Sequence, residues 1–127
     1  MNYLIDTQVL IWFLNGNVLL RDRIRKIIEN LHNNRFVSIA SLWEIAIKMN
    51  IGKLDLDYDF EQMFLQIEHH SFEILPIKPK HLHYHRNLEI LHKDPFDRLL
   101  ISTAITENMK LITSDENIHK YPVDWVW

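Results

Sequence analysis

Cysteine is absent from this sequence of 127 residues, and glycine occurs only twice. Without cysteine the protein has no disulfide framework, no zinc site ligated by cysteine and no thiol nucleophile. The two glycines, Gly16 and Gly52, stand alone, so neither G-x-x-x-x-G-K-[ST] nor G-x-G-x-x-G is present to bind a nucleotide phosphate. There is also no G-x-S-x-G motif of the esterase type. The lack of cysteine is compatible with a reducing cytoplasm.

Neither a strong excess of charge nor a long apolar run occurs. Lysine and arginine number 14 against 17 acidic residues, for a net charge of −3, so no overall positive field indicates nucleic-acid binding. No segment approaches the roughly 20 apolar residues of a membrane helix, and the N-terminus lacks the basic region and cleavage site of a signal peptide. We therefore expect a cytoplasmic protein without a membrane partner. Length and composition predict a single globular domain over residues 1–127.

Strand and helix patterns alternate along the chain. Short apolar runs predict strands at 3–5, 36–39, 72–75, 111–113 and 123–127, and helical patterns fall at 9–14, 18–31, 41–49, 59–69, 80–91 and from 95 onward. This alternation predicts an α/β fold, a three-layer α/β/α sandwich with a central parallel sheet. Ligands of such sheets bind beyond the carboxyl ends of the strands, so the residues that follow each strand are the candidates for function.

Four acidic residues fall near the predicted carboxyl edge. Asp6 follows the first strand, Glu44 lies one turn into the helix after the second, and Asp115 follows the fourth. Asp97 lies in the first turn of the helix that leads into the fourth strand, which a right-handed crossover brings to the same edge. Four carboxylates gathered there repel one another unless cations neutralise them. Because carboxylate oxygens suit hard cations, the pattern predicts a Mg²⁺ or Mn²⁺ site suited to phosphodiester hydrolysis.

Each acid also has a purely structural interpretation. The segment 41–44, Ser-Leu-Trp-Glu, fits the S-x-x-E capping box. Asp94 suits the N-cap of the helix that begins at residue 95, and Asp97 is an acid at the third position of that helix. Asp6 and Asp115 also stand where helices begin. Under this alternative the protein is a catalytically inactive scaffold or RNA-binding module whose acids only cap helices.

Four blocks spread along the chain carry a family resemblance. They are 3–7 (YLIDT), 38–48 (SIASLWEIAIK), 92–101 (HKDPFDRLLI) and 111–115 (LITSD). Together they resemble the PIN-domain ribonucleases of the VapC-like toxin group, one half of a type II toxin–antitoxin pair. The resemblance implies a Mg²⁺- or Mn²⁺-dependent endoribonuclease whose catalytic residues and metal ligands are Asp6, Glu44, Asp97 and Asp115. It also implies an RNA substrate, neutralisation by a cognate antitoxin and a homodimer.

Four neighbouring residues are candidates for accessory roles. Thr7 and Ser114 flank two of the acids and could orient a water or a phosphate oxygen, with helix capping as the alternative. Asp94 is an additional acid, and Arg98 could bind a phosphate or pair with an acid. Gln8 stands where relatives often carry histidine, so its role in proton transfer or RNA contact stays open.

Basic residues also lie near the acids in sequence. Lys48, Lys53, Lys93 and the run 21–26 could form a rim that binds a nucleic-acid backbone. For the run 21–26, a solvated helix face is the better-supported alternative.

Histidine and tryptophan leave two further questions. His81, His83 and His85 alternate, but no third ligand converges on them, and we expect them at the surface. Trp12 follows Asp6 by a turn or two, and Trp43 stands next to Glu44. They either fill the core or line a groove where a segment of the antitoxin docks.

Overall fold

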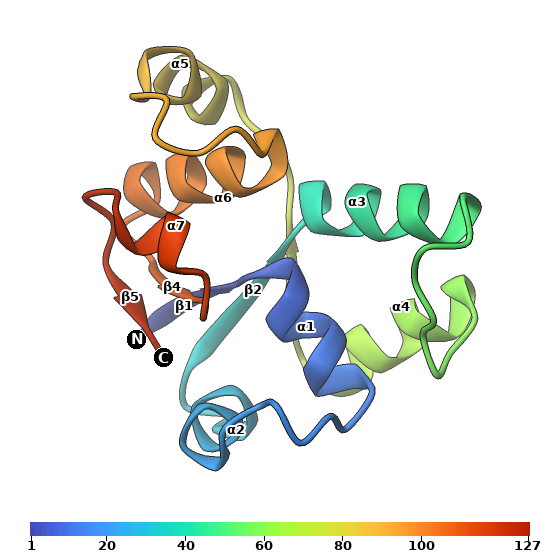
Figure 1. Ribbon diagram of the computed structural model, residues 1–127. Coiled ribbons are helices and arrows are strands. Elements are labelled where there is room, and N and C mark those ends of the chain that lie inside the picture. The colour runs from blue at the N-terminus through green and yellow to red at the C-terminus, as the bar shows by residue number, and fades with distance from the viewer.

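Five parallel strands form one central sheet in the computed structural model, which describes residues 1–127 (Figure 1). The strands are β1 (Asn2–Ile5), β2 (Asn34–Ser38), β3 (Glu73–Leu75), β4 (Lys110–Ile112) and β5 (Trp125–Val126). Their order across the sheet is β3-β2-β1-β4-β5, and every neighbouring pair is parallel. The predicted parallel sheet is therefore confirmed.

Helices cover both faces of this sheet (Figure 1). They are α1 (Thr7–Leu14), α2 (Asp22–Glu29), α3 (Ile39–Asn50), α4 (Phe60–His69), α5 (Pro79–Asn87), α6 (Pro95–Thr106) and α7 (Glu116–His119). None of these seven helices has the length and hydropathy that crossing a membrane requires.

Alternate side chains of the strands enter two separate cores. Tyr3 and Ile5 of β1 pack with residues of α1 to α4, whereas Leu4 packs with residues of α6 and α7. In β4, Ile112 belongs to the first core and Leu111 to the second. A strand that is buried on both sides needs apolar residues at consecutive positions, which explains the unbroken apolar runs of the sequence. The three-layer α/β/α sandwich is thus confirmed.

The strands are added on one side of β1 first and on its other side afterwards, so the strand order reverses at β1. Strands β2 and β3 are added outward on one side of β1, and the segment with α5 and α6 then returns to place β4 on the other side. The backbone N–H of Asp6 donates to the carbonyl oxygen of Ile112 at 3.0 Å, so the ends of β1 and β4 are joined. The carboxyl edge at such a switch point is where open α/β sheets bind ligands.

Two helices are shorter than the sequence pattern predicts. α2 covers Asp22–Glu29 rather than 18–31, because the side chain of Asn17 accepts a hydrogen bond from the backbone two residues on and folds a turn before the helix. Leu31, expected on the buried face, is 74% exposed. α5 covers Pro79–Asn87 rather than 80–91, since Leu88 adopts extended backbone and is buried.

The histidines of α5 do not all lie at the surface. His81 is fully buried: its Nδ1 accepts a hydrogen bond from the backbone N–H of Lys78 at 3.0 Å, and its Nε2 lies 2.9 Å from Oε1 of Glu107. The surface prediction is wrong for His81, which joins α5 to the end of α6. His83 is exposed and His85 is half-buried.

Candidate active site

A cavity of about 320 Å³ opens at the carboxyl edge of the sheet, near the ends of β1 and β4. Its lining comprises Asp6, Thr7, Gln8, Ile11, Glu44, Lys48, Asp94, Asp97, Ser114 and Asp115. All four candidate acids line the cavity, together with three of the four candidate accessory residues. The fold thus brings carboxylates from four distant segments of the chain to one polar hollow.

The side chain of Asp6, directly after β1, is held by Thr113, the residue that follows β4. The hydroxyl of Thr113 donates to its Oδ2 at 2.7 Å, and the side chain makes no hydrogen bond that caps α1. Burial raises the pKa of the Asp6 carboxyl to about 7 from 3.8; the Thr113 hydrogen bond opposes this, and the charges of Asp97 and Asp115 add to it. Helix capping therefore does not explain Asp6.

Asp97 lies in the first turn of α6, where His92 holds it. Nε2 of His92 and Oδ2 of Asp97 are 2.9 Å apart. Burial raises the pKa of Asp97 to about 6; the hydrogen bond to His92 lowers it, and the nearby charges of Asp94, Asp115 and Glu44 raise it further. Two of the four acids therefore have carboxyl groups that bind protons near neutral pH.

Asp94 and Asp115 do cap helices, as the structural interpretation expects. Oδ1 of Asp94 accepts from the backbone N–H groups of Phe96 and Asp97, at 2.9 and 3.3 Å. Oδ1 of Asp115 accepts from the N–H of Asn117 at 2.9 Å. Capping occupies one oxygen of each carboxylate, and Oδ2 makes no hydrogen bond within the protein. Both residues can therefore cap a helix and still offer an oxygen to the cavity.

Glu44 is not part of a capping box, so that interpretation is wrong. α3 begins at Ile39, directly after the end of β2, so its N-cap is Ser38 and not Ser41, three residues later. Glu44 lies inside the helix, where its Oε2 pairs with Nζ of Lys48 at 3.0 Å. Its Oε1 is buried without any hydrogen-bond partner. A buried acceptor without a partner is costly, and a bound cation relieves that cost.

A model of the PIN domain matches residues 3–124. This chain belongs to the PIN-domain family. Among solved structures, the chain is similar to VapBC2 from Rickettsia felis bound to a DNA fragment from their promoter, with a TM-score of 0.72, 22% identity and coverage of 100% of this chain and 99% of that one. It is also similar to FitAcB from Neisseria gonorrhoeae, with a TM-score of 0.67, 15% identity and coverage of 98% and 96%.

A third similar structure is VapBC-1 from nontypeable Haemophilus influenzae, with a TM-score of 0.61, 19% identity and coverage of 99% and 97%. No protein with curated annotation matches the sequence. At these identities the likeness to solved structures shows the fold, and the chain spans nearly the whole length of each similar structure.

The donor groups of this PIN domain fit a hard divalent cation. Oxygen atoms dominate the cavity, and the unpaired Oε1 of Glu44 is a buried acceptor of the kind that a cation satisfies. His92, Asp94 and Asp97 each offer a ligand atom within 4.8 Å of the others, and no other trio of histidine or acid is as compact. Nε2 of His92 is already paired with Oδ2 of Asp97 and His92 does not line the cavity, so His92 positions this acid; carboxylates that do not contact a cation directly would reach it through water, as is usual for Mg²⁺.

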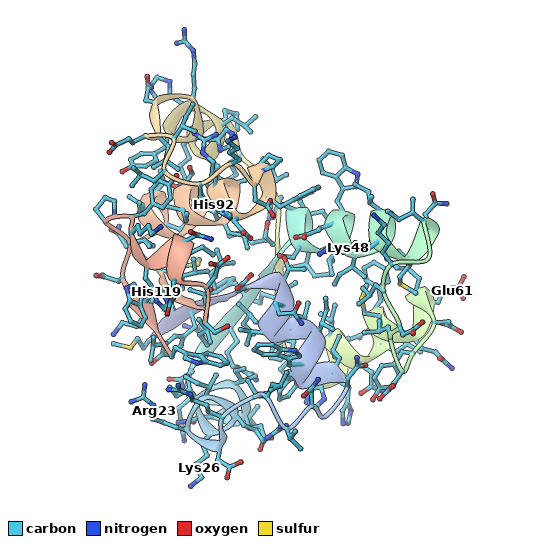
Figure 2. All side chains as sticks on the ribbon, viewed as in Figure 1. Arg23, Lys26, Lys48, Glu61, His92 and His119 are labelled. Atoms are coloured by element: carbon cyan, nitrogen blue, oxygen red, sulfur yellow. The ribbon has the colours of Figure 1, made fainter.

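Two residues of the PIN site escaped the sequence analysis. Thr113 directly follows β4, and a hydroxyl in that place, two residues before Asp115, was an available signal. His92 opens the HKDPFD segment five residues before Asp97. In Figure 2, His92 lies beside α6, and Lys48 lies on the side of α3 that faces α1.

Arg98 is not part of the cavity of the PIN domain. Its Nη2 donates to the carbonyl oxygen of Leu88 at 3.0 Å, so the guanidinium ties α6 to the segment after α5. Arg98 pairs with no acid in the structure, and its contact with a phosphate stays a prediction. The side chain turns toward the carbonyl oxygen of Leu88, the residue that directly follows α5.

The two tryptophans in question differ. Trp12 is half-buried and packs against Trp127, with ring centroids 5.8 Å apart. Trp43 is 59% exposed and makes an edge-to-face contact with Phe96 at 5.3 Å. Only Trp43 presents most of its surface at the side of the PIN domain near the cavity.

Proposed function

We propose that this PIN domain is a Mg²⁺- or Mn²⁺-dependent endoribonuclease that hydrolyses RNA phosphodiester bonds at the cavity of Asp6, Glu44, Asp97 and Asp115. One observation carries the proposal: these acids share a cavity in which burial and mutual repulsion raise the pKa of Asp6 and Asp97 to about 7 and about 6. A scaffold protein gains nothing from this arrangement, which lowers its stability at neutral pH. A divalent cation offsets the repulsion.

Asp6, Asp97, Asp115 and Glu44 would hold the cation. When bound, the cation lowers the pKa of a coordinated water and neutralises charge on the phosphate. The chain's own residues orient the carboxylates: the Thr113 hydroxyl holds Oδ2 of Asp6 and the His92 ring holds Oδ2 of Asp97.

Other residues of the cavity provide charge and hydrogen-bonding groups. The ammonium group of Lys48, 3.0 Å from Glu44, is a cation at the edge of the cavity that can pair with a phosphate oxygen. The Thr7 hydroxyl gives its proton to Oγ of Ser41 at 2.7 Å, so its oxygen stays an acceptor toward a water. Ser114 lines the cavity beside Asp115, and we propose the same orienting role for its hydroxyl.

The proposal extends to a toxin that a cognate antitoxin neutralises, acting in the cytoplasm as a homodimer. The antitoxin is supported by the similar VapBC structures, whereas the homodimer and the cytoplasm rest on the family resemblance alone. The physical reason for inhibition at this site is that an arginine or lysine supplied by a partner relieves the repulsion among the carboxylates and excludes the metal.

Cleavage of end-labelled single-stranded RNA tests the enzyme. Purified protein is incubated with EDTA, Mg²⁺ or Mn²⁺, alongside Asp6→Asn and Asp97→Asn, with the exposed Glu61→Gln as matched control. We expect cleavage by the wild type and by Glu61→Gln only when metal is present, and none by the other two variants. Cleavage in EDTA or by Asp6→Asn contradicts the proposal. A folded wild type that cuts no RNA with either metal supports the inactive scaffold.

A further inference from the structure

A second hollow of about 490 Å³ lies next to the candidate active site. It runs between the C-terminal half of α3 and the first turn of α6, and Glu44, Lys48 and Asp94 line both hollows. The two hollows therefore adjoin each other and share these three residues as a common wall. Its remaining walls are partly apolar and partly basic.

The apolar wall belongs to a strip along α3, of which Ile47 and Ile51 line the hollow and Trp43 lies at its edge, in contact with Phe96. Trp43, Ile47 and Ile51 follow one another at intervals of four residues, which places them on one side of the helix. All three are exposed, Trp43 the most. The ring of Phe96, at the start of α6, meets Trp43 edge to face at an angle of 71°. Phe96 therefore holds the indole in place, while more than half of the Trp43 side chain stays exposed and can contact a ligand.

The basic part consists of Lys53 and Lys93, which lie on opposite sides of the hollow. Both are exposed, and neither pairs with an acid in the structure. Three lysines (Lys48, Lys53 and Lys93) line the hollow against two acids, so the hollow is locally positive although the net charge of the protein is −3. Lysines that bind phosphates and an aromatic ring that stacks a base are the combination found in sites for single-stranded nucleic acid.

We propose that this groove, lined by Ile47, Lys53, Lys93 and Phe96 with Trp43 at its rim beside Phe96, binds the single-stranded RNA next to the cleaved phosphate. A base stacks on the Trp43 indole, and Lys53 and Lys93 bind the phosphates on either side. The inference rests on the proposed function, which places the scissile phosphate in the adjoining cavity. Two observations select RNA as the occupant: the unpaired positive charge of the groove and the residues that it shares with the acidic cavity.

Binding of a fluorescent single-stranded RNA of ten nucleotides tests the groove, measured by anisotropy with Mg²⁺ in an Asp97→Asn background that prevents cleavage. Trp43→Ala is expected to weaken the affinity about tenfold, since one stacked base contributes roughly that much or more. Trp43→Phe should restore most of the loss. The matched control is Trp125→Ala, which removes another exposed tryptophan, on β5.

The two lysines are tested by the dependence of affinity on salt. Lys53→Gln and Lys93→Gln should each reduce the slope of log K against log salt by about 0.7, the value for one phosphate contact on a single strand. Trp43→Ala should leave this slope unchanged. Lys26→Gln, which removes an exposed lysine on α2, serves as control.

Several results would contradict the proposal that RNA binds in this groove. If Trp43→Ala and Trp125→Ala bind RNA equally well, the stacking contact is wrong. If Trp43→Ala keeps its RNA affinity but changes the oligomeric state in size-exclusion chromatography, the strip joins two copies of the chain. If it keeps its RNA affinity but loses binding to a partner protein, the strip docks that partner.

The RNA-binding groove and the proposed nuclease function can be refuted independently of each other. If RNA binds through Trp43 but no metal supports cleavage by the otherwise unaltered protein, the groove stands and the proposed nuclease is wrong. If metal supports cleavage but Trp43→Ala leaves the RNA affinity and KM unchanged, the nuclease stands and the groove is wrong.

Discussion

The hydroxyl of Thr113 donates a 2.7 Å hydrogen bond to Oδ2 of Asp6, although 107 positions separate the two residues in the chain. The bond joins the end of β1 to the residue after β4, at the switch point of the sheet. It is the main interaction that opposes the effect of burial on the Asp6 carboxyl. Asp6 is thus oriented by the protein but remains costly to ionise.

Replacing Asp6 by Asn should stabilise the protein without metal. The folded pKa is about 7 and the ordinary value is 3.8, so between these values the folded state holds a proton that the unfolded state has lost. The stability of the wild type therefore falls as pH rises from 4 through 7. We expect Asp6→Asn to raise the Tm by about 4 °C or more at pH 8 and by little at pH 4. Thermal melts in EDTA at both pH values measure this, and a lower Tm at pH 8 would contradict it.

Divalent metal should stabilise the wild type in a way that depends on pH. Mg²⁺ or Mn²⁺ requires ionised carboxylates, and Asp6 and Asp97 bind protons with pKa values of about 7 and about 6. We expect the metal-dependent rise in Tm to be larger at pH 8 than at pH 5.5, following the concentration dependence of a bound ligand. Asp97→Asn should lose most of this rise. An equal rise in both proteins would place the metal elsewhere.

His92 should act by holding Asp97. Because its hydrogen bond lowers the pKa of Asp97, His92→Ala should raise that pKa and weaken Mn²⁺ binding by about tenfold or more. Calorimetric titration with Mn²⁺ measures the change. His92→Asn, which can still donate a hydrogen bond, should recover part of the affinity. His85→Ala, on α5, is the matched control, and equal effects of the two alanine variants would refute a specific role for His92.

Glu107 should stabilise the fold at neutral pH and not in acid. Hydrogen bonds from Lys80 and His81 lower the pKa of its carboxyl to about 2 from 4.5. This stabilisation is fully present above pH 4.5 and is lost as pH falls through 2. We expect Glu107→Gln to lower the Tm by about 4 °C or more at pH 7, with a difference that shrinks between pH 4.5 and pH 2. Thermal melts across this range test it, and a difference independent of pH would point to packing instead.

Trp12 and Trp43 should contribute differently to the stability of the fold. Trp12 packs on Trp127 while Trp43 is mostly exposed, so Trp12→Ala should cost about 2 kcal/mol of the free energy of unfolding, below the value for a fully buried tryptophan. Trp43→Ala should cost about 0.5 kcal/mol or less. Urea denaturation gives both values. Equal losses would mean that Trp43 packs more than its exposure indicates.

Local signals predicted the elements, whereas distant contacts decided the details of the site. The helix start at Asp94 and the acid at Asp97 are encoded in consecutive residues, and the structure has them as expected. The start of α3 was misplaced because Ser38 and Ser41 both suit an N-cap, and only the end of β2 selects between them. The burial of His81 depends on Glu107, 26 residues away, which no local pattern contains.

The same limit applies to hydrogen bonds inside the cavity. The four acids were predicted from their positions after strands, which requires only the sheet topology. The partners Thr113 and His92 require knowledge of which side chains meet across that edge. The direction of Arg98 likewise depends on the carbonyl of Leu88, ten residues earlier, and on where α5 ends.

The placement of β4 beside β1 also determines when the site can first exist. A ribosome produces β1, β2 and β3 before the segment that completes the cavity, so the growing chain holds Asp6 and Glu44 but neither Asp97 nor Asp115. β1, the central strand, lacks one neighbour throughout that period, and its pairing with β4 is a long-range contact that forms slowly. Under the proposed nuclease function, a nascent chain therefore cannot cleave the messenger RNA that encodes it until β4 has been made and has joined the sheet.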